Sequence, residues 1–114
     1  MKHLEISNET YEKIKDQLTE VEKADLTCYN DMIGKKYFLR TVTYHVVGEV
    51  VGVFDTFIQL KNASWVADSG RFMDAISEGN LNEVEPIKNI LWNVNMSTVV
   101  DFGLWKHPLP KEQK

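Results

Sequence analysis

The stretch GEVVGVFDTFIQLKNASW, residues 48–65, combines two features that decide the expected fold. Apolar residues alternate with others on both sides of Asp55 and Thr56, as in two strands joined by a tight turn. Gly48 and Gly52 interrupt the first of these strands, where glycine marks a sharp bend or a close approach of two backbones. Because such bends let a short sheet curl, the stretch favours a small barrel over an isolated hairpin.

The composition is that of one soluble domain. The chain has 114 residues, of which 43% are hydrophobic and 26% charged. No run approaches the roughly 18 apolar residues of a membrane span, and the N-terminal residues contain no apolar signal segment. We therefore expect a cytoplasmic protein without a membrane partner. Cys28 is the only cysteine, so no disulfide can form within the chain.

Charge is distributed unevenly along the chain, whose net charge is −4. Residues 1–33 hold four lysines against eight acids, and residues 66–86 hold one arginine against five acids. Residues 34–65 and 87–114 each hold four basic residues against two acids. This pattern leaves room for an anionic ligand on the strand-forming segments, but it argues against charge-driven binding of long nucleic acid.

The order of local patterns predicts a single domain that is mainly β. From Lys36 the apolar period changes to two and the residues become rich in Val, Thr, Tyr and Phe. One strand face is expected to carry Phe38, Val42, Tyr44 and Val46, unless a bulge resets the register. The expected parts are a helical N-terminal part at 1–33, three strands at 36–65, a helical insertion at 66–86, two strands at 87–105 and an extended tail at 106–114.

Two helices are expected. Residues 8–24 carry apolar side chains at the three-and-four spacing of one helix face. In the insertion, Asp68 or Ser69 is expected to cap a short helix and Gly79 to end it.

Together, this order and the opening motif resemble the Sm-like family, in particular its bacterial RNA-chaperone branch. The resemblance lies in VVGEVVGVFDTFIQLKN, with MSTVV at 96–100 similar to the last strand of that branch. It implies a strongly bent, SH3-like five-stranded barrel behind an N-terminal helix. It also implies a homo-oligomeric ring of six or seven subunits, in which strand four of one subunit pairs with strand five of the next.

The sequence also departs from the family pattern. WNVN stands at 92–95, where the bacterial branch has a Tyr-Lys-His element, and the Arg-Gly pair of the other branches is missing. The segments SWVADSGRF, LNEVEP and HPLPKEQK are similar to small uncharacterised proteins of phages and prophages. A phage protein of this kind would act in the cytoplasm of its bacterial host.

The resemblance implies a ligand site on the hairpin. Phe57 takes the place of the base-stacking residue and Gln59 that of the base-contacting residue, while Lys61 and Asn62 follow where a phosphate or ribose would lie. The residues alone leave alternatives open: Phe57 as a core residue, and Gln59 and Lys61 as solvated strand positions. Asp55 either shapes the turn through its carboxylate or contacts the ligand.

Arg71 is a further candidate, because an arginine beside a helix start suits an anion. The alternative is an ion pair with the neighbouring Asp68 or Asp74. We expect no cofactor, no metal and no enzyme, since His3, His45 and His107 lack ligand spacing. The sequence also shows no nucleotide-binding loop and no DNA-specific motif.

These observations lead to one functional hypothesis with two alternatives. We expect a non-enzymatic ring that binds nucleobase-containing ligands, either RNA or a small nucleotide, through the hairpin at Asp55. The first alternative is a phage accessory or virion-associated structural protein without a nucleotide ligand. The second is a phage protein that sequesters a signalling nucleotide of the host.

Overall fold

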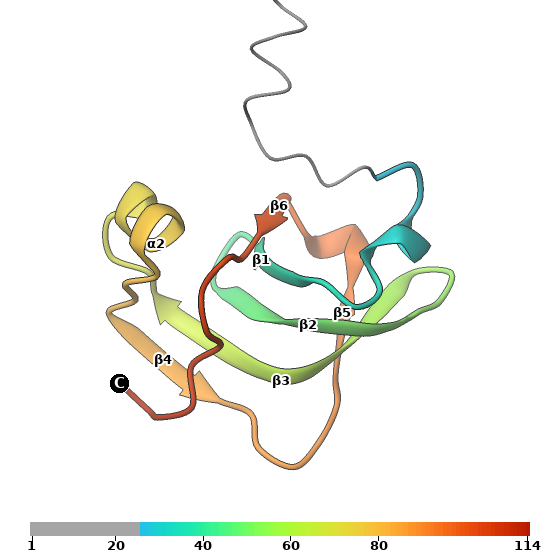
Figure 1. Cartoon of the computed structure of the whole chain (residues 1–114). Helices are drawn as coiled ribbons and strands as arrows, with labels where there is room; N and C mark the ends of the chain where they lie inside the picture. The colour runs from blue at the N-terminus through green and yellow to red at the C-terminus, as the bar shows by residue number, and fades with distance from the viewer. Residues whose placement is uncertain (1–25) are drawn as a thin grey trace, which may run out of the picture.

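The computed structural model describes residues 26–114, and the helix expected at 8–24 lies outside them. In chain order the elements are η1 (Tyr29–Met32), β1 (Lys36–Arg40), β2 (His45–Val53), β3 (Phe57–Asp68), α2 (Phe72–Glu78), β4 (Glu83–Pro86), β5 (Trp92–Asn95), η2 (Met96–Thr98) and β6 (Asp101–Leu104). The prediction of a mainly β fold with a short helix inside it is confirmed (Figure 1).

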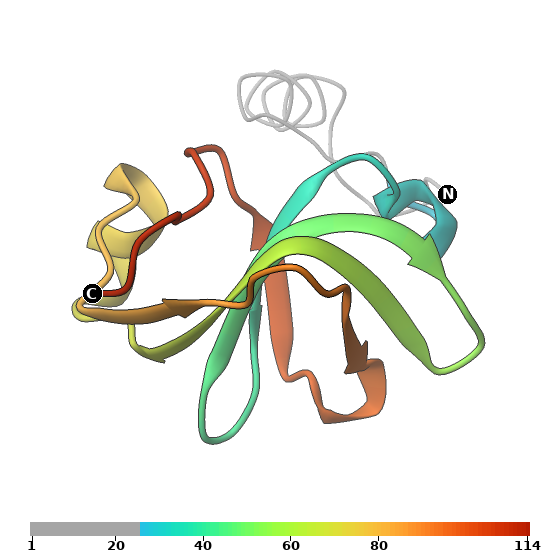
Figure 2. The ribbon, with the colours of Figure 1, turned by 90° about the horizontal axis from the view of Figure 1, so that it is seen from below.

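All strands belong to one antiparallel sheet of six strands, in the order β4-β3-β2-β1-β6, with β5 also paired to β3. The second edge of β3 is thus shared by β5 near its start and β4 near its end, as Figure 2 shows from below. The sheet is not closed. Within the described residues, β6 pairs only with β1 and β5 only with β3.

The sixth strand comes from the segment expected to be only a helical insertion. Residues 83–86 form β4, and β3 runs on to Asp68 instead of ending at residue 65. The helix α2 ends at Gly79, which is left-handed as predicted. Its N-cap is Arg71 instead of Asp68 or Ser69, because the Asp68 carboxylate accepts the N–H of Gly70 at 2.8 Å and shapes the preceding turn.

The last strand also begins later than expected. Residues 96–100 were predicted to be strand, but Met96–Thr98 form the 3-10 turn η2 and β6 starts at Asp101. The cause is local: the Asn95 side-chain oxygen accepts hydrogen bonds from the N–H of Ser97 at 3.0 Å and from its hydroxyl at 2.8 Å.

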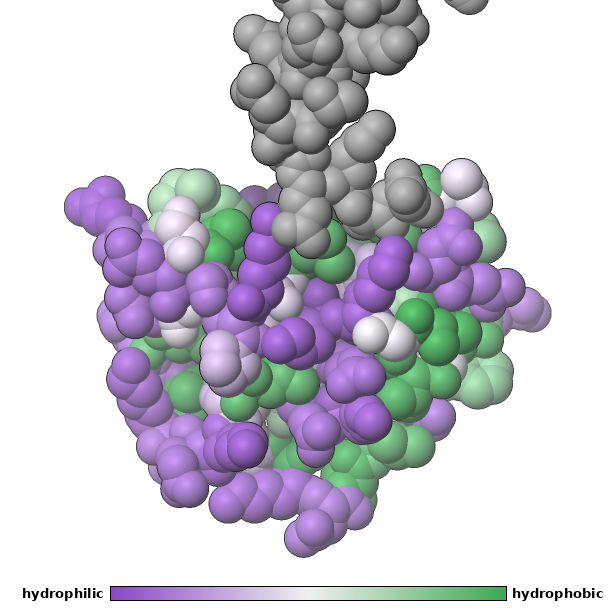
Figure 3. All heavy atoms as spheres, viewed as in Figure 1, coloured by the Kyte–Doolittle hydropathy of each residue, from purple (hydrophilic) through white to green (hydrophobic). Residues whose placement is uncertain are grey.

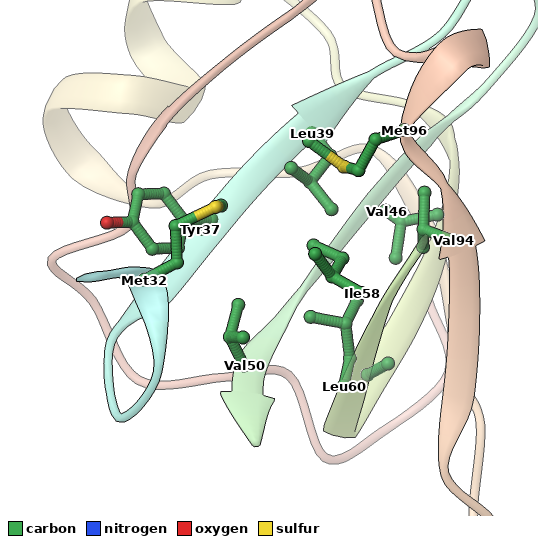
Figure 4. Packing of buried hydrophobic residues seen from close by; sticks show 10 residues of the cluster. Met32, Tyr37, Leu39, Val46, Val50, Ile58, Leu60, Val94 and Met96 are labelled. Atoms are coloured by element: carbon green, nitrogen blue, oxygen red, sulfur yellow. The ribbon is translucent and has the colours of Figure 1, made fainter. Parts of the chain in front are cut away.

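The sheet buries a cluster of side chains on each face. Tyr37 and Leu39 of β1 join the inner cluster, whereas Phe38 between them points into the outer one. The prediction that Phe38 and Val46 share a face is wrong, since Phe38 pairs with Val47 and the turn before β2 leaves Val42 exposed. Figure 4 shows the inner cluster, whose buried members are Met32, Tyr37, Leu39, Val46, Val50, Ile58, Leu60, Ala63, Val94 and Met96.

A bend in the β2–β3 hairpin sits where Gly48 meets Ala63. A Cβ built on Gly48 would lie 3.1 Å from both the Cα and the Cβ of Ala63, which is tighter than most real contacts, so glycine favours this close approach of the two backbones. The pairing register shifts after Val47, and Asn62 adopts a positive φ of 52°. The close approach predicted for Gly48 is therefore confirmed.

The C-terminal tail follows the outer face of the sheet. The Lys36 ammonium donates to the carbonyl of His107 at 2.6 Å, and the Trp105 indole donates to the carbonyl of Pro108 at 3.2 Å. Lys114 exchanges two backbone hydrogen bonds with Val84 of β4, which places the chain end beside that strand (Figure 2). The extended tail predicted from residue 106 is thus present.

Replacing Gly48 by alanine should destabilise the fold by about 1–3 kcal/mol, because the new methyl group forces the two backbones apart. Gly103→Ala is the matched control, since no atom lies within 4 Å of a Cβ added there. Urea unfolding of both variants measures the difference. Equal stability of the two variants would contradict the importance of the contact between Gly48 and Ala63.

Candidate ligand-binding face

The turn between β2 and β3 carries a stacked pair of aromatic rings. The ring centroids of Phe54 and Phe57 lie 4.7 Å apart with an interplanar angle of 19°. Phe57 is half-buried, whereas 48% of the Phe54 surface is exposed. On the face seen in Figure 3, hydrophobic residues gather on the side where this hairpin ends. An exposed, braced aromatic ring can stack a further flat group.

Backbone contacts hold this turn together. The N–H of Phe54 donates to the carbonyl of Phe57 at 2.9 Å, and the N–H of Met96 donates to the carbonyl of Thr56 at 2.8 Å. Asp55 is exposed, and its carboxylate accepts no hydrogen bond from any residue between 26 and 114. The scaffold role expected for the Asp55 side chain is therefore not seen, and the carboxylate faces solvent.

Beyond the turn, one face of β3 presents Phe57, Gln59 and Lys61. These residues alternate with Ile58 and Leu60, which point into the inner core, so the three side chains project from the opposite face. Phe57 and Gln59 are half-buried and Lys61 is exposed. At about 3.3 Å per residue, Phe57 and Lys61 stand about 13 Å apart along the strand.

The neighbouring strand β5 adds amide groups beside this row. Asn95 pairs with Phe57, and the exposed Asn93 pairs with Gln59. Asn95 is engaged in capping η2, but Asn93 makes no side-chain hydrogen bond within residues 26–114. Gln59 and Asn93 therefore provide two adjacent amides that can donate and accept hydrogen bonds.

Lys61 also borders a hollow of about 910 Å³, which we call the lysine groove. Its walls are the middle of β3, the connection from β4 to β5, the tail and the start of β1. The lining residues are Lys36, Lys61, Asn62, Ala63, Pro86, Ile87, Lys88, Asn89, Ile90, Leu91, Pro108, Leu109, Pro110 and Lys111.

The lysine groove is strongly cationic. Among residues 26–114, four lysines line it and no aspartate or glutamate does, although the chain as a whole is acidic. Lys36 donates to the carbonyl of His107, whereas Lys61, Lys88 and Lys111 form no ion pair within the described part of the chain. The fold thus unites the two basic segments of the sequence, because Lys36 and Lys61 come from one and the other two lysines from the other.

Apolar side chains complete the wall of the groove. Ile90 and Leu91 are 56% and 49% exposed, and they line the hollow together with the tail prolines Pro108 and Pro110. Asn89 adopts a positive φ of 68°, so the chain turns sharply just before them. The groove therefore offers both charge and apolar contact to a ligand.

The structure separates the six residues that the sequence singled out. Lys61 and Asn62 line the groove, Asp55 and Phe57 lie at the hairpin turn, and Gln59 lies between them. Arg71 belongs to neither region, because it follows the far end of β3 as the N-cap of α2. The ion pair expected between Arg71 and a neighbouring aspartate is not formed.

Sequence reasoning missed the other groove lysines at positions 36, 88 and 111. Their only signal is the net charge of +2 on each of the segments 34–65 and 87–114. That signal predicted a basic β region but could not show that the tail folds back against β3.

A second hollow of about 510 Å³ lies between α2 and β6. Arg40 donates from Nε and Nη2 to the two carboxylate oxygens of Asp101, at 2.6 Å each, and its guanidinium lies 4.5 Å from the ring centre of Phe72. The hydrogen bonds from Arg40 lower the pKa of Asp101. Because Arg40 is already paired with Asp101, this hollow has less positive charge for binding an anion than the lysine groove has.

Replacing Asp101 by asparagine should lower the urea midpoint modestly at pH 7, since the pair is partly exposed. The folded-state pKa of Asp101 lies below the unfolded value of about 3.9, so the stabilisation is complete above that pH. It is lost as the pH falls through the folded-state pKa. The urea midpoints of the wild type and of Asp101→Asn should therefore converge as the pH falls from 7. Glu85→Gln is the control, because Glu85 forms no ion pair within residues 26–114. A constant gap would contradict this assignment.

Two further features bear on the kind of site. Among residues 26–114, no three His, Cys, Asp or Glu side chains lie together as metal ligands would. In the same part of the chain, no helix has the length and apolar character needed to cross a membrane.

No protein-family model matches the chain, and a search of curated proteins also finds no match.

Proposed function

We propose that this chain is a non-enzymatic protein that binds nucleobase-containing ligands on the outer face of β3. The main observation in support is the stacked pair of Phe54 and Phe57, with the amide of Gln59 next to it on the same face. An aromatic ring stacks any base with about 1–3 kcal/mol. A side-chain amide reads a base edge by donating and accepting hydrogen bonds.

The remaining groups of this face suit the same ligand class. Lys61 continues the row toward the lysine groove, where positive charge can meet a phosphate, and Asn62 lies next to it. The face thus supplies stacking, amide hydrogen bonds and charge in that order along one strand. Under this proposal Asp55 remains at the rim of the site, and Arg71 takes no part.

The proposal includes an Sm-like, homo-oligomeric assembly. Within residues 26–114 the border strands of the sheet are β4, β5 and β6. The outer edge of β4 exchanges backbone hydrogen bonds with Lys114 at Val84, whereas β5 and β6 each pair on one side only. Such open edges favour strand addition from another copy. Val100, just before β6, is 63% exposed and adds apolar surface there. A ring would form when β6 of one subunit pairs with β5 of the next, which would make the open sheet part of a continuous one.

The experiments below also distinguish two other functions. A virion-associated structural protein of a phage would use the strand edges without any nucleotide affinity. A phage protein that sequesters a host signalling nucleotide in the host cytoplasm would bind a small nucleotide more tightly than RNA. The acidic net charge of −4 favours a short ligand over a long polyanion.

Replacing Phe57 by alanine should weaken binding of a fluorescein-labelled oligouridine by about 5- to 150-fold, the equivalent of one lost stacking contact. Phe72→Ala is the control, because Phe72 is a phenylalanine that lies in α2, away from the hairpin. Fluorescence anisotropy at low salt gives the affinities, and urea unfolding shows that both variants fold.

The outcomes of that experiment separate the functions. Equal binding by both variants would contradict the stacking site. Binding that weakens steeply as salt rises indicates RNA contacts through phosphates. A wild-type protein that binds no oligonucleotide or nucleotide at any salt concentration would instead support the structural role.

The wild-type protein should have a native mass of about six or seven chains of 13.2 kDa each. Val100→Lys places a charge at the proposed junction and should shift the protein toward monomer. Val42→Lys is the control, since Val42 is 87% exposed in the turn between β1 and β2. Light scattering coupled to size exclusion measures the masses, and a monomeric wild-type protein would exclude the ring.

A further inference from the structure

We infer that the lysine groove is a phosphate-binding site for ligands that carry several adjacent phosphates. This site is separate from the aromatic pair and needs no base for its recognition. Its ligand chemistry is shared by two sources, a free nucleoside triphosphate and the 5′-triphosphate end of a short RNA.

The charges of the groove carry the inference. Lys36, Lys61, Lys88 and Lys111 line one hollow, and the last three have no ion-pair partner within residues 26–114. Glu49 is the strand-register partner of both Lys36 and Lys61 and offsets part of their charge, but it does not line the hollow. The excess of like charges on the lining leaves a net repulsion among the lysines. A bound polyanion would remove that repulsion and gain charge-assisted hydrogen bonds at the same time. A single phosphate cannot engage lysines from three separate walls as well as a row of phosphates can.

The walls of the groove are held in place without a ligand. The ammonium of Lys36 is fixed by the carbonyl of His107, which also ties the start of the tail to the sheet. On the other side, the N–H of Ile87 donates to the carbonyl of Ala63 at 2.8 Å. Lys88, next along the chain, therefore extends from a segment anchored to β3. A site organised in advance loses less entropy on binding.

The size of the groove suits a small ligand. Small-molecule sites span about 300–1,000 Å³, and the volume of about 910 Å³ lies within that range. The tail and the connection from β4 to β5 border the hollow. The hollow therefore suits the end of an RNA chain better than the middle of a long RNA. Ile90, Leu91 and the tail prolines can cover the apolar part of an attached nucleoside.

A link to the aromatic pair rests on the proposed function. Lys61 belongs to both regions and stands about 13 Å from Phe57 along β3. One ligand can therefore occupy both only if it spans at least two nucleotides. The groove alone requires no such ligand, so the two sites can be tested apart.

The probe for the groove is inorganic triphosphate, measured by isothermal titration calorimetry at low salt. The double variant Lys88→Ala with Lys111→Ala should lose at least about tenfold in affinity, because two charge-assisted contacts disappear. Lys114→Ala is the matched control, since Lys114 belongs to the same tail but does not line the groove. Both lysines of the double variant are exposed, so its urea midpoint should match that of the wild type.

Each outcome decides the inference. Triphosphate that does not bind the wild type, or that binds the double variant and Lys114→Ala equally, overturns it. Phe57→Ala should bind triphosphate as the wild type does, and a parallel loss there would also overturn a separate phosphate site. If the double variant weakens oligonucleotide binding and Phe57→Ala does not, the phosphate site is supported and the stacking proposal is contradicted.

Two further ligands identify the source. A nucleoside triphosphate that binds as tightly as 5′-triphosphorylated trinucleotide RNA supports the inference with a free nucleotide as ligand. Tighter binding of the RNA supports it with a strand end as ligand. Equal binding of the same RNA without its triphosphate would contradict the role of the groove.

Discussion

The close contact between Gly48 and Ala63 determines how β2 and β3 pair where the sheet bends. A methyl group at Gly48 would lie 3.1 Å from the Cα and the Cβ of Ala63, so the two backbones would have to move slightly apart to accommodate it. At this point the pairing shifts and Asn62 turns left-handed, so the alternation along β3 is reset. The inner core therefore continues from Leu60 to Ala63, while Lys61 and Asn62 both border the groove on the outer side.

The fold separates the basic segments of the chain from an acidic one. The basic segments of the sequence form the sheet and the tail that crosses it, while the acids of residues 66–86 lie mainly around α2 and β4. The protein can thus be acidic overall and still present a cationic hollow whose lining, within residues 26–114, contains no acid. Local potential, and not net charge, governs which ligand enters such a hollow.

The sequence predicted the hairpin at Asp55, the bend at Gly48 and the helix that ends at Gly79, because turns and caps are local properties of a few residues. It missed β4, whose strand EVEP is too short and polar to show a clear period of two and forms because β3 offers it an edge. It placed Phe57, Gln59 and Lys61 on one hairpin as candidate site residues, but it did not predict the groove. The groove depends on a tail residue, Lys111, that meets β3 only through the tertiary fold.

Two regions therefore lie along one strand, β3: an aromatic pair at the turn and a lysine groove at the bend. The most direct measurement is an NMR titration of the assigned backbone amides with a 5′-triphosphorylated trinucleotide. We expect shifts at residues 54–62, at 88–91 and in the tail around Lys111, and none in α2. Shifts confined to α2 and β6, around the second hollow, would contradict this expectation.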